Sequence, residues 1–241
     1  SGKTFSALRL ATGMQRVIGG DIWFIDTEHR RSLHYADKFK FRFVEFNQPY
    51  GPLDYLAAIE HCVRQRAKII IIDSMTHEHS GDGGVLDQID QFLNEKCGDD
   101  VNKRDKFLQL AHIKPKHDRK RLNNRIIQLG INAVFCYRAD DKTKPKTGKG
   151  LVHVGWTPDT TSKLIYEMSQ TFLLLPGCDG RPTITPEKQE EKNLVKNPAQ
   201  FRGWFDDKMQ LNEDLGARMA EWARGDKIGT APAPAGADEK L

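Results

Sequence analysis

The sequence predicts an α/β fold, with a twisted, mainly parallel sheet and helices on both of its faces. Two observations support this prediction. Residues 69–72 are four consecutive isoleucines that lead into Asp73, as expected of a strand buried on both faces. Residues 1–4 (SGKT) match the last four positions of the phosphate-binding loop G-x-x-x-x-G-K-[ST], and a helical pattern follows them. Open α/β sheets bind ligands at the carboxyl ends of their strands, which is where Asp73 is expected.

Composition limits the class of protein. The chain has 241 residues, 38% hydrophobic and 29% charged, which fits an α/β core with an appendage. No window approaches the ~18 apolar residues of a membrane helix, so we expect no membrane partner. The four cysteines are scattered and form no CxxC pair, which favours reduced thiols in the cytoplasm.

The positive charge of the chain is concentrated in its middle. Residues 103–149 contain 14 Lys and Arg against 4 Asp, a net charge of +10. The total is +4, so the remaining residues sum to −6. Such a basic block predicts contact with a polyanion or, alternatively, an ordinary solvated surface.

The first half of the chain alternates predicted helices and strands. Residues 4–17 have apolar side chains at helical spacing. Residues 21–26 predict a buried strand, and the alternation of residues 41–46 predicts a half-buried one. Pro52 is well suited to the first turn of the next helix, which precedes the isoleucine strand.

The second half begins with residues 85–97, which predict an amphipathic helix, whereas residues 103–113 show no clear pattern. A basic helix starts at Pro115, and its charged face either contacts phosphates or is simply solvated. Residues 132–138 predict the next core strand. Residues 139–162 predict a long lysine-rich loop, a kind of segment that is usually functional or disordered.

Beyond this loop we expect a short strand over residues 181–186 and a charged linker over 187–197. A last amphipathic helix follows, with Asn212 as its cap. The predicted organisation is a core over residues 1–186, a linker and helix over 187–225, and a disordered tail over 226–241.

Several segments, in this order, resemble the ATPase core of the RecA recombinase family. They are residues 24–29 (FIDTEH), 47–49 (NQP) and 69–74 (IIIIDS). Compact phage and prophage RecA-like ATPases, linked to single-strand annealing and recombination, resemble the chain most closely in size. The resemblance covers residues 1–176 and weakens after residue 80. It implies a helix over residues 162–166 and a strand over 171–175. It implies a RecA-like P-loop core whose first strand precedes Ser1, and a homo-oligomer, ring or filament, in the cytoplasm of a bacterial host or phage-infected cell.

The phosphate loop and the strand aspartate together predict a site for ATP and Mg²⁺. The expected nucleotide-binding residues are Ser1, Gly2, Lys3, Thr4 and Phe5. Lys3 would reach the β- and γ-phosphates, and Thr4 and Asp73 would hold the Mg²⁺. The amino end of the following helix favours phosphate through its N–H groups and its dipole.

The residue after Asp73 is Ser74, which cannot serve as a catalytic base. The resemblance implies that Glu28, at the end of the neighbouring strand, polarises the attacking water. Glu78 is the alternative base. Its two histidine neighbours lack the spacing of a zinc-binding helix, so we expect no zinc site. Arg138 stands where the family carries a polar γ-phosphate sensor, usually Gln, and would act in cis or across a subunit interface.

The resemblance also implies that the loop over residues 139–162 contacts single-stranded DNA. Its expected DNA-binding residues are Lys142, Lys144, Lys146, Lys149 and Trp156. Lysines neutralise phosphates, and an indole ring stacks on a base. The predicted function is Mg²⁺-dependent ATP hydrolysis by a protein that acts on single-stranded DNA in recombination or annealing. The alternatives are a nucleotide-gated assembly switch without DNA binding, and a helicase or packaging motor.

Overall fold

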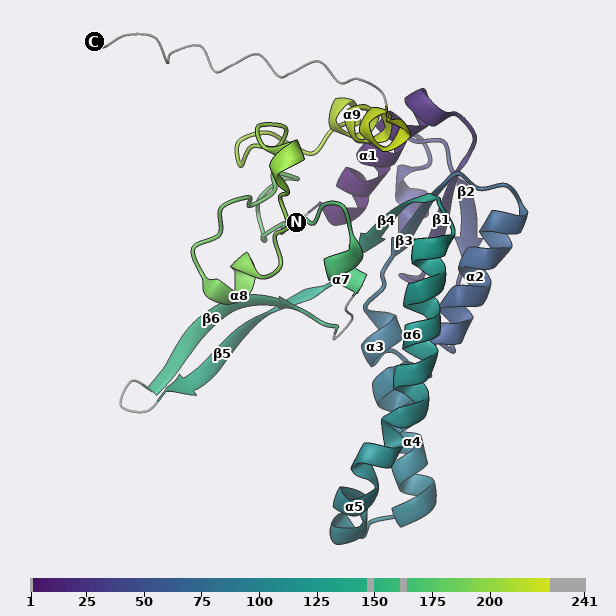
Figure 1. Cartoon of the computed structure of the whole chain (residues 1–241), viewed down its shortest axis with the longest axis vertical. Helices are drawn as coiled ribbons and strands as arrows, with labels where there is room; N and C mark the ends of the chain where they lie inside the picture. The colour runs from purple at the N-terminus through teal and green to yellow at the C-terminus, as the bar shows by residue number, and fades with distance from the viewer. Residues whose placement is uncertain (1, 147–149, 161–163, 226–241) are drawn as a thin grey trace.

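The computed structural model describes residues 2–146, 150–160 and 164–225. At its centre lies a sheet of four parallel strands, β1 (Ile22–Asp26), β2 (Arg42–Glu45), β3 (Ile69–Asp73) and β4 (Asn132–Cys136). The strands lie in the order β2-β1-β3-β4 (Figure 1). The predicted α/β architecture with a mainly parallel sheet is confirmed. Ser1 and the tail over residues 226–241 lie outside the described residues.

Helices cover both faces of the sheet. Helix α1 (Lys3–Ile18) packs on one face, and α2 (Pro52–Arg64) and α6 (Ile113–Gln128) pack on the other. The other helices of the described residues are α3 (His77–Ser80), α4 (Val85–Cys97), α5 (Val101–Ala111), α7 (Leu164–Glu167), α8 (Gln189–Lys192) and α9 (Glu213–Arg224), with the 3-10 helices η1 (Arg31–Tyr35) and η2 (Ala199–Phe201). Within the described residues, none is long and apolar enough to cross a membrane.

The isoleucines of β3 connect the two layers of the core. All four are buried, and alternate side chains of a strand point to opposite faces. Ile69 and Ile71 pack in a cluster with α1, whereas Ile70 and Ile72 pack in a cluster with α2 and α6. Full burial of such a side chain contributes roughly 1.5–3 kcal/mol. This two-sided burial is why β3 occupies an inner position in the sheet.

Helix α9 packs directly on α1 through two glycines. A Cβ atom added to Gly13 would lie 1.7 Å from the carbonyl oxygen of Glu213, and one added to Gly216 would lie 2.0 Å from that of Leu10. The predicted cap is confirmed, because the Asn212 side chain accepts a hydrogen bond from an N–H in the first turn of α9. The last helix is therefore fixed to the helix that begins with Lys3.

Helices α4, α5 and α6 form an arm that extends beyond the carboxyl edge of the sheet, as both figures show. Residues 103–113, whose sequence shows no clear pattern, form most of α5 and the start of α6. The pattern is unclear because α5 buries few apolar side chains. Phe107 and Ala111 pack toward α4, whereas Leu108 and Leu110 stay exposed.

The expectation of a long loop over residues 139–162 is wrong for most of its length. Strands β5 (Ala139–Lys146) and β6 (Gly150–Pro158) pair antiparallel and form a hairpin that projects from the core (Figure 1). Apolar alternation did not reveal β5 because the side chains of Asp140, Asp141, Lys142 and Thr143 are all exposed. Backbone pairing, together with contact between β6 and α8, defines the hairpin.

The strand expected over residues 171–175 is not a member of the sheet. Within the described residues, Leu173 forms an isolated antiparallel bridge with Thr183, which also replaces the short strand expected over 181–186. Phe172 and Leu174 pack instead against an aromatic cluster that includes Phe201. The charged segment over residues 187–197 contains the short helix α8.

Candidate functional site

Parallel pairing brings the predicted phosphate and metal residues together. Asp26 pairs in register with Asp73, so both strands end at the same edge of the sheet. The Lys3 ammonium at the start of α1 is hydrogen-bonded to one carboxylate oxygen of Asp73. The Thr4 hydroxyl donates to the other oxygen at 2.5 Å. Lys3, Thr4 and Asp73, far apart in sequence, therefore form one contiguous polar cluster.

The turn before α1 contains a glycine, which leaves the backbone N–H groups of the turn accessible to a ligand. Gly2 precedes the helix with a φ of 76°, a left-handed conformation that favours glycine. The N–H groups of the first turn of α1 point out from the helix, and their dipoles favour an anion. Phe5 has a different environment from Lys3 and Thr4, because its ring packs on Tyr35 and Phe39 at centroid distances of 5.8 and 5.3 Å.

The Glu28 carboxylate lies close to three cationic side chains. Arg138 donates to both of its carboxylate oxygens, at 3.0 and 2.5 Å. The Lys3 ammonium lies 3.9 Å away and the Arg31 guanidinium 3.7 Å away. Burial alone would raise the pKa of Glu28, but the Arg138 hydrogen bonds and the Lys3 charge outweigh it and hold the pKa below its ordinary value. Glu28 is therefore ionised at neutral pH.

Lys3 is held charged in the same way. Burial opposes the charged form, but the Asp73 carboxylate outweighs it, and the pKa of Lys3 is raised above its ordinary value. Arg138, whose side chain is half exposed, also has a raised pKa because of its hydrogen bonds to Glu28. The cluster consequently holds two cations and two carboxylates in direct pairs.

Asp26 shapes the turn that carries Glu28, a role the sequence reading did not assign to it. Its carboxylate accepts from the Glu28 N–H at 2.7 Å and from the Ser32 N–H at 2.9 Å. The Ser32 hydroxyl donates to it as well. A buried acceptor with three donors fixes the backbone around Glu28. The sequence signal that could have indicated this role of Asp26 is a carboxylate at the end of a predicted buried strand.

A cavity of about 400 Å³ opens over this cluster. Its lining residues are Gly2, Lys3, Thr4, Glu28, Arg31, His34, Tyr35 and Asp73. The sequence reading missed the three that come from η1, namely Arg31, His34 and Tyr35. They follow the FIDTEH segment directly, so their proximity to Glu28 in sequence was the signal that could have found them. They add a cation, an imidazole and a phenol to the wall of the cavity.

Glu78, the alternative base, is not among the residues that line this cavity. It is 2% exposed, and Arg119 on α6 donates to both of its oxygens at 2.8 Å. Burial raises its pKa above the ordinary value, although Arg119 opposes that shift. The pair joins the arm to the core, which is a structural role. Among the described residues no group of three or more His, Cys, Asp or Glu is arranged to hold a metal, so the adjacent histidines form no such cluster.

The base of the hairpin is bonded to the carboxyl edge of the sheet. The Arg138 N–H donates to the Thr76 hydroxyl at 2.8 Å, and the Asp159 N–H donates to the Arg138 carbonyl at 3.0 Å. The Ser80 hydroxyl donates to the Asp159 carboxylate at 2.6 Å. Arg138 therefore connects the hairpin with Glu28 in the cavity.

The predicted DNA-binding residues of the hairpin have different environments. Lys142 is exposed on β5. Trp156 is half-buried at the base of β6, where its backbone N–H donates to the Glu191 carboxylate at 3.1 Å. Lys149 and the side chains of Lys144 and Lys146 lie outside the described residues.

A second, larger cavity lies beside β4. Its volume is about 550 Å³, and apolar side chains from α1, β4 and the segment around Phe172 line it, among them Leu10, Met14, Val134 and Leu174. Within the described residues, β4 pairs with β3 alone, so its outer edge carries backbone groups that no strand uses. The cavity is a groove along that edge.

No protein-family model, curated protein or solved structure matches this chain.

Proposed function

We propose that this chain is a Mg²⁺-dependent P-loop ATPase with a RecA-like core that acts on single-stranded DNA in recombination or annealing. The observation that carries this proposal is the convergence of Lys3, Thr4, Asp73 and Glu28 on one cavity. A helix amino end, a lysine, a hydroxyl and a strand carboxylate are the groups that P-loop enzymes use for a nucleotide and its metal.

The residues present fit ATP and Mg²⁺. Thr4 and Asp73 offer adjacent oxygen atoms, and Mg²⁺ prefers one or two such protein ligands, completed by water and phosphate oxygens. The bound metal would neutralise charge on the β- and γ-phosphates. Lys3 would exchange its contact with Asp73 for the phosphates, and the amino end of α1 would hold them against the helix dipole.

Glu28 is the proposed base. It would accept a proton from the water that attacks the γ-phosphorus, while the bond from that phosphorus to the bridging oxygen breaks and ADP leaves. In the structure both Glu28 oxygens are bonded to Arg138. Arg138 must therefore release Glu28 before the water can approach. A bound γ-phosphate would be an alternative anionic partner for the Arg138 guanidinium.

The groove beside β4 supports the finer proposal of a RecA-like core. An apolar strand parallel to β4 would use the free edge of β4 and fill the groove between β4 and the segment around Phe172. Such a strand would lead through a phosphate loop into Lys3. We place it ahead of Ser1, where the loop pattern needs four further residues.

DNA binding and self-assembly are the other parts of the proposal. The hairpin carries Lys142 on an exposed strand and starts directly after Arg138, so occupancy of the cavity would be transmitted to it. The Arg138–Glu28 pair also fits a nucleotide-gated assembly switch without DNA, the second candidate. A nucleotide bound between the subunits of a ring or filament would be compatible with both candidate functions.

The first test is ATP hydrolysis by Glu28→Gln, in a chain whose phosphate loop is complete. We expect the rate to fall at least about 100-fold while nucleotide affinity stays within about threefold, because only the base is lost. Glu45→Gln is the matched control, since Glu45 also ends a strand and pairs with an arginine, Arg30. An unchanged rate in Glu28→Gln would contradict the assignment. Stimulation of the wild-type rate by single-stranded DNA separates the recombination ATPase from the switch.

A further inference from the structure

The arm formed by α4, α5 and α6 is rigidly joined to the core. Arg119 pairs with buried Glu78, and Arg125 pairs with Glu60 of α2 at 2.9 Å. Leu122 and Ile126 of α6 belong to the main core cluster. The arm is therefore a fixed extension of the ATPase core rather than a separate unit, and what its surface binds will be positioned relative to the cavity.

The exposed surface of α6 carries cations and no carboxylate. The cationic residues of the helix are Lys114, Lys116, Arg119, Lys120, Arg121 and Arg125. Its acidic residue is Asp118, which is buried and bonded to Lys114 at 2.7 Å. Every charge that α6 shows to solvent is therefore positive.

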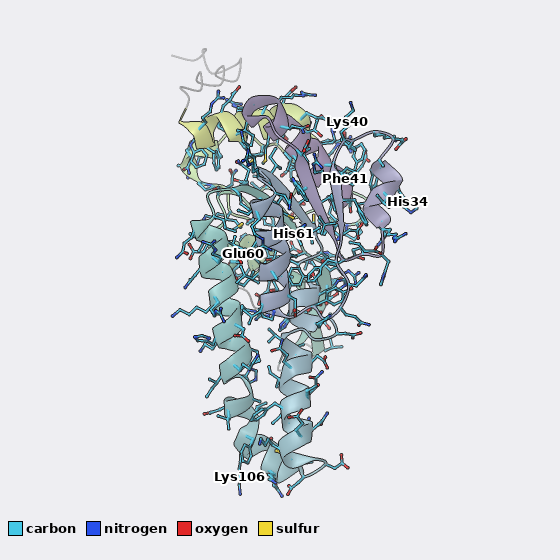
Figure 2. All side chains as sticks on the ribbon, turned by 90° about the vertical axis from the view of Figure 1, so that its right-hand side faces the viewer. His34, Lys40, Phe41, Glu60, His61 and Lys106 are labelled. Atoms are coloured by element: carbon cyan, nitrogen blue, oxygen red, sulfur yellow. The ribbon has the colours of Figure 1, made fainter. Side chains whose placement is uncertain are left out.

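Lys116, Lys120 and Arg121 are exposed and make no side-chain hydrogen bond or ion pair with any residue that the structure describes. Lys116 and Lys120 are one turn apart, and like charges at this spacing destabilise a helix by a few tenths of a kcal/mol. An external anion along this face would remove that repulsion. On α5, Lys103 and Lys106 extend the positive surface toward the far end of the arm, where Figure 2 shows Lys106.

We propose that the exposed face of α6 binds the phosphate backbone of the same single-stranded DNA that the hairpin contacts. This inference rests on the proposed function and adds a second DNA-binding surface to it. Lysine is depleted in protein–protein interfaces, whereas Lys and Arg make most phosphate contacts, so the charge pattern favours a nucleic acid over a protein partner. A helix of 16 residues is ~24 Å long, enough to follow several nucleotides.

The position of the two surfaces supports a shared ligand. The arm follows the carboxyl end of β3, and the hairpin follows the carboxyl end of β4, its neighbour in the sheet. Both project from the edge that holds the cavity, as Figure 1 shows. One strand of DNA contacting both would cross the face on which nucleotide is bound.

The test compares a triple variant, Lys116→Gln, Lys120→Gln and Arg121→Gln, with the wild-type chain. Binding of a fluorescent single-stranded oligonucleotide is measured by anisotropy over a range of salt concentrations. Each phosphate contact contributes about 0.7 to the slope of log affinity against log salt. We expect the triple variant to lose about 2 from that slope and to bind at least about tenfold more weakly at low salt.

The matched control is Lys38→Gln, Lys40→Gln and Arg64→Gln. It removes the same charge from exposed positions near the opposite edge of the sheet, where Figure 2 shows Lys40. This control should keep the wild-type slope. The DNA-independent rate of ATP hydrolysis and the melting temperature should stay unchanged in both triple variants, which excludes misfolding as the cause.

Two outcomes overturn the inference in different ways. If the wild-type chain binds DNA and the α6 variant keeps its affinity and slope, the arm is not a DNA surface, although the proposed function survives. If the wild-type chain hydrolyses ATP but binds no DNA at low salt, the DNA role itself fails, and the arm inference fails with it.

Discussion

At the scale of single residues, the site depends on pairs between side chains that are distant in sequence. Lys3 bonds to Asp73, and Arg138 bonds to Glu28. Each charged group is partly desolvated, and each pair compensates for that cost. A nucleotide with its metal would exchange these internal pairs for contacts with phosphate oxygens. In the structure the cations and carboxylates of the cluster neutralise one another, and the proposed nucleotide would have to compete with these pairs.

The pKa of Glu28 gives a prediction for Arg138→Gln. Arg138 holds that pKa below the ordinary value of 4.5, so ionised Glu28 stabilises the fold above about pH 4.5 and this contribution is lost as the pH falls through the lower, folded-state pKa. We expect Arg138→Gln to melt at a lower temperature than the wild type at neutral pH, with the difference closing as the pH falls below 4.5 and Glu28 becomes protonated. Thermal unfolding measured at a series of pH values checks this.

The control for that measurement is Arg30→Gln, which breaks the exposed pair with Glu45. Exposed pairs contribute little because water and salt screen them, so the difference should be small at every pH. A melting difference for Arg138→Gln that does not change with pH would show that its effect does not act through the charge of Glu28.

Of the site, the sequence predicted Lys3, Thr4, Asp73 and Glu28, because each belongs to a motif with fixed spacing, and the structure brings them together. It did not predict the contact of Arg138 with Glu28, which depends on where the chain turns after β4. It also missed Tyr35 and the rest of η1, because a short 3-10 helix has no periodicity to detect.

At the scale of elements, strands and helices that bury a regular apolar face were predictable, and those that do not were missed. The isoleucine strand and the helix capped by Asn212 have clear patterns. Strand β5 and helix α5 are largely exposed, so their side chains follow no apolar period. The close packing of α9 on α1 was also invisible, because a glycine in a helical pattern does not reveal what lies against it.

That packing gives a prediction for Gly216→Ala. The added methyl group would collide with the backbone of Leu10, which cannot move without shifting α1 and Lys3. Overpacking typically costs 1–3 kcal/mol, about 2–12 °C in melting temperature for a chain of this size. We expect this loss even though alanine favours helices more than glycine does. The melting temperature measured by thermal unfolding and the affinity for nucleotide should both decrease.

Ala223→Ser is the control, because it adds one heavy atom at an exposed position of the same helix. It should change the melting temperature by no more than about 2 °C, in line with ordinary surface substitutions. A Gly216→Ala chain as stable as the wild type would mean that α9 can move away from α1 without cost, and that α9 does not fix the position of α1 and Lys3.

At the scale of the whole molecule, the groove beside β4 is where the core has room for another element. Among the described residues, no strand pairs with the outer edge of β4, and apolar side chains line the groove beside it. A parallel strand would pair with that edge and cover the apolar side chains, and Lys3 at the start of α1 is among the residues that line the groove. A strand in the groove would therefore extend the sheet and also lead into the proposed phosphate loop before Lys3.

The last prediction concerns a chain extended ahead of Ser1 by an apolar strand and the four residues that complete the loop pattern. We expect it to melt at least about 5 °C higher than the unextended chain, because each buried apolar side chain contributes roughly 1.5–3 kcal/mol against the entropy of ordering. Amide hydrogens of β4 should exchange more slowly, and nucleotide affinity should rise. An extension of equal length made of Gly and Ser is the control and should change none of the three. Equal behaviour of the two extensions would show that the groove accepts no strand, and would remove the support that it gives to a RecA-like core.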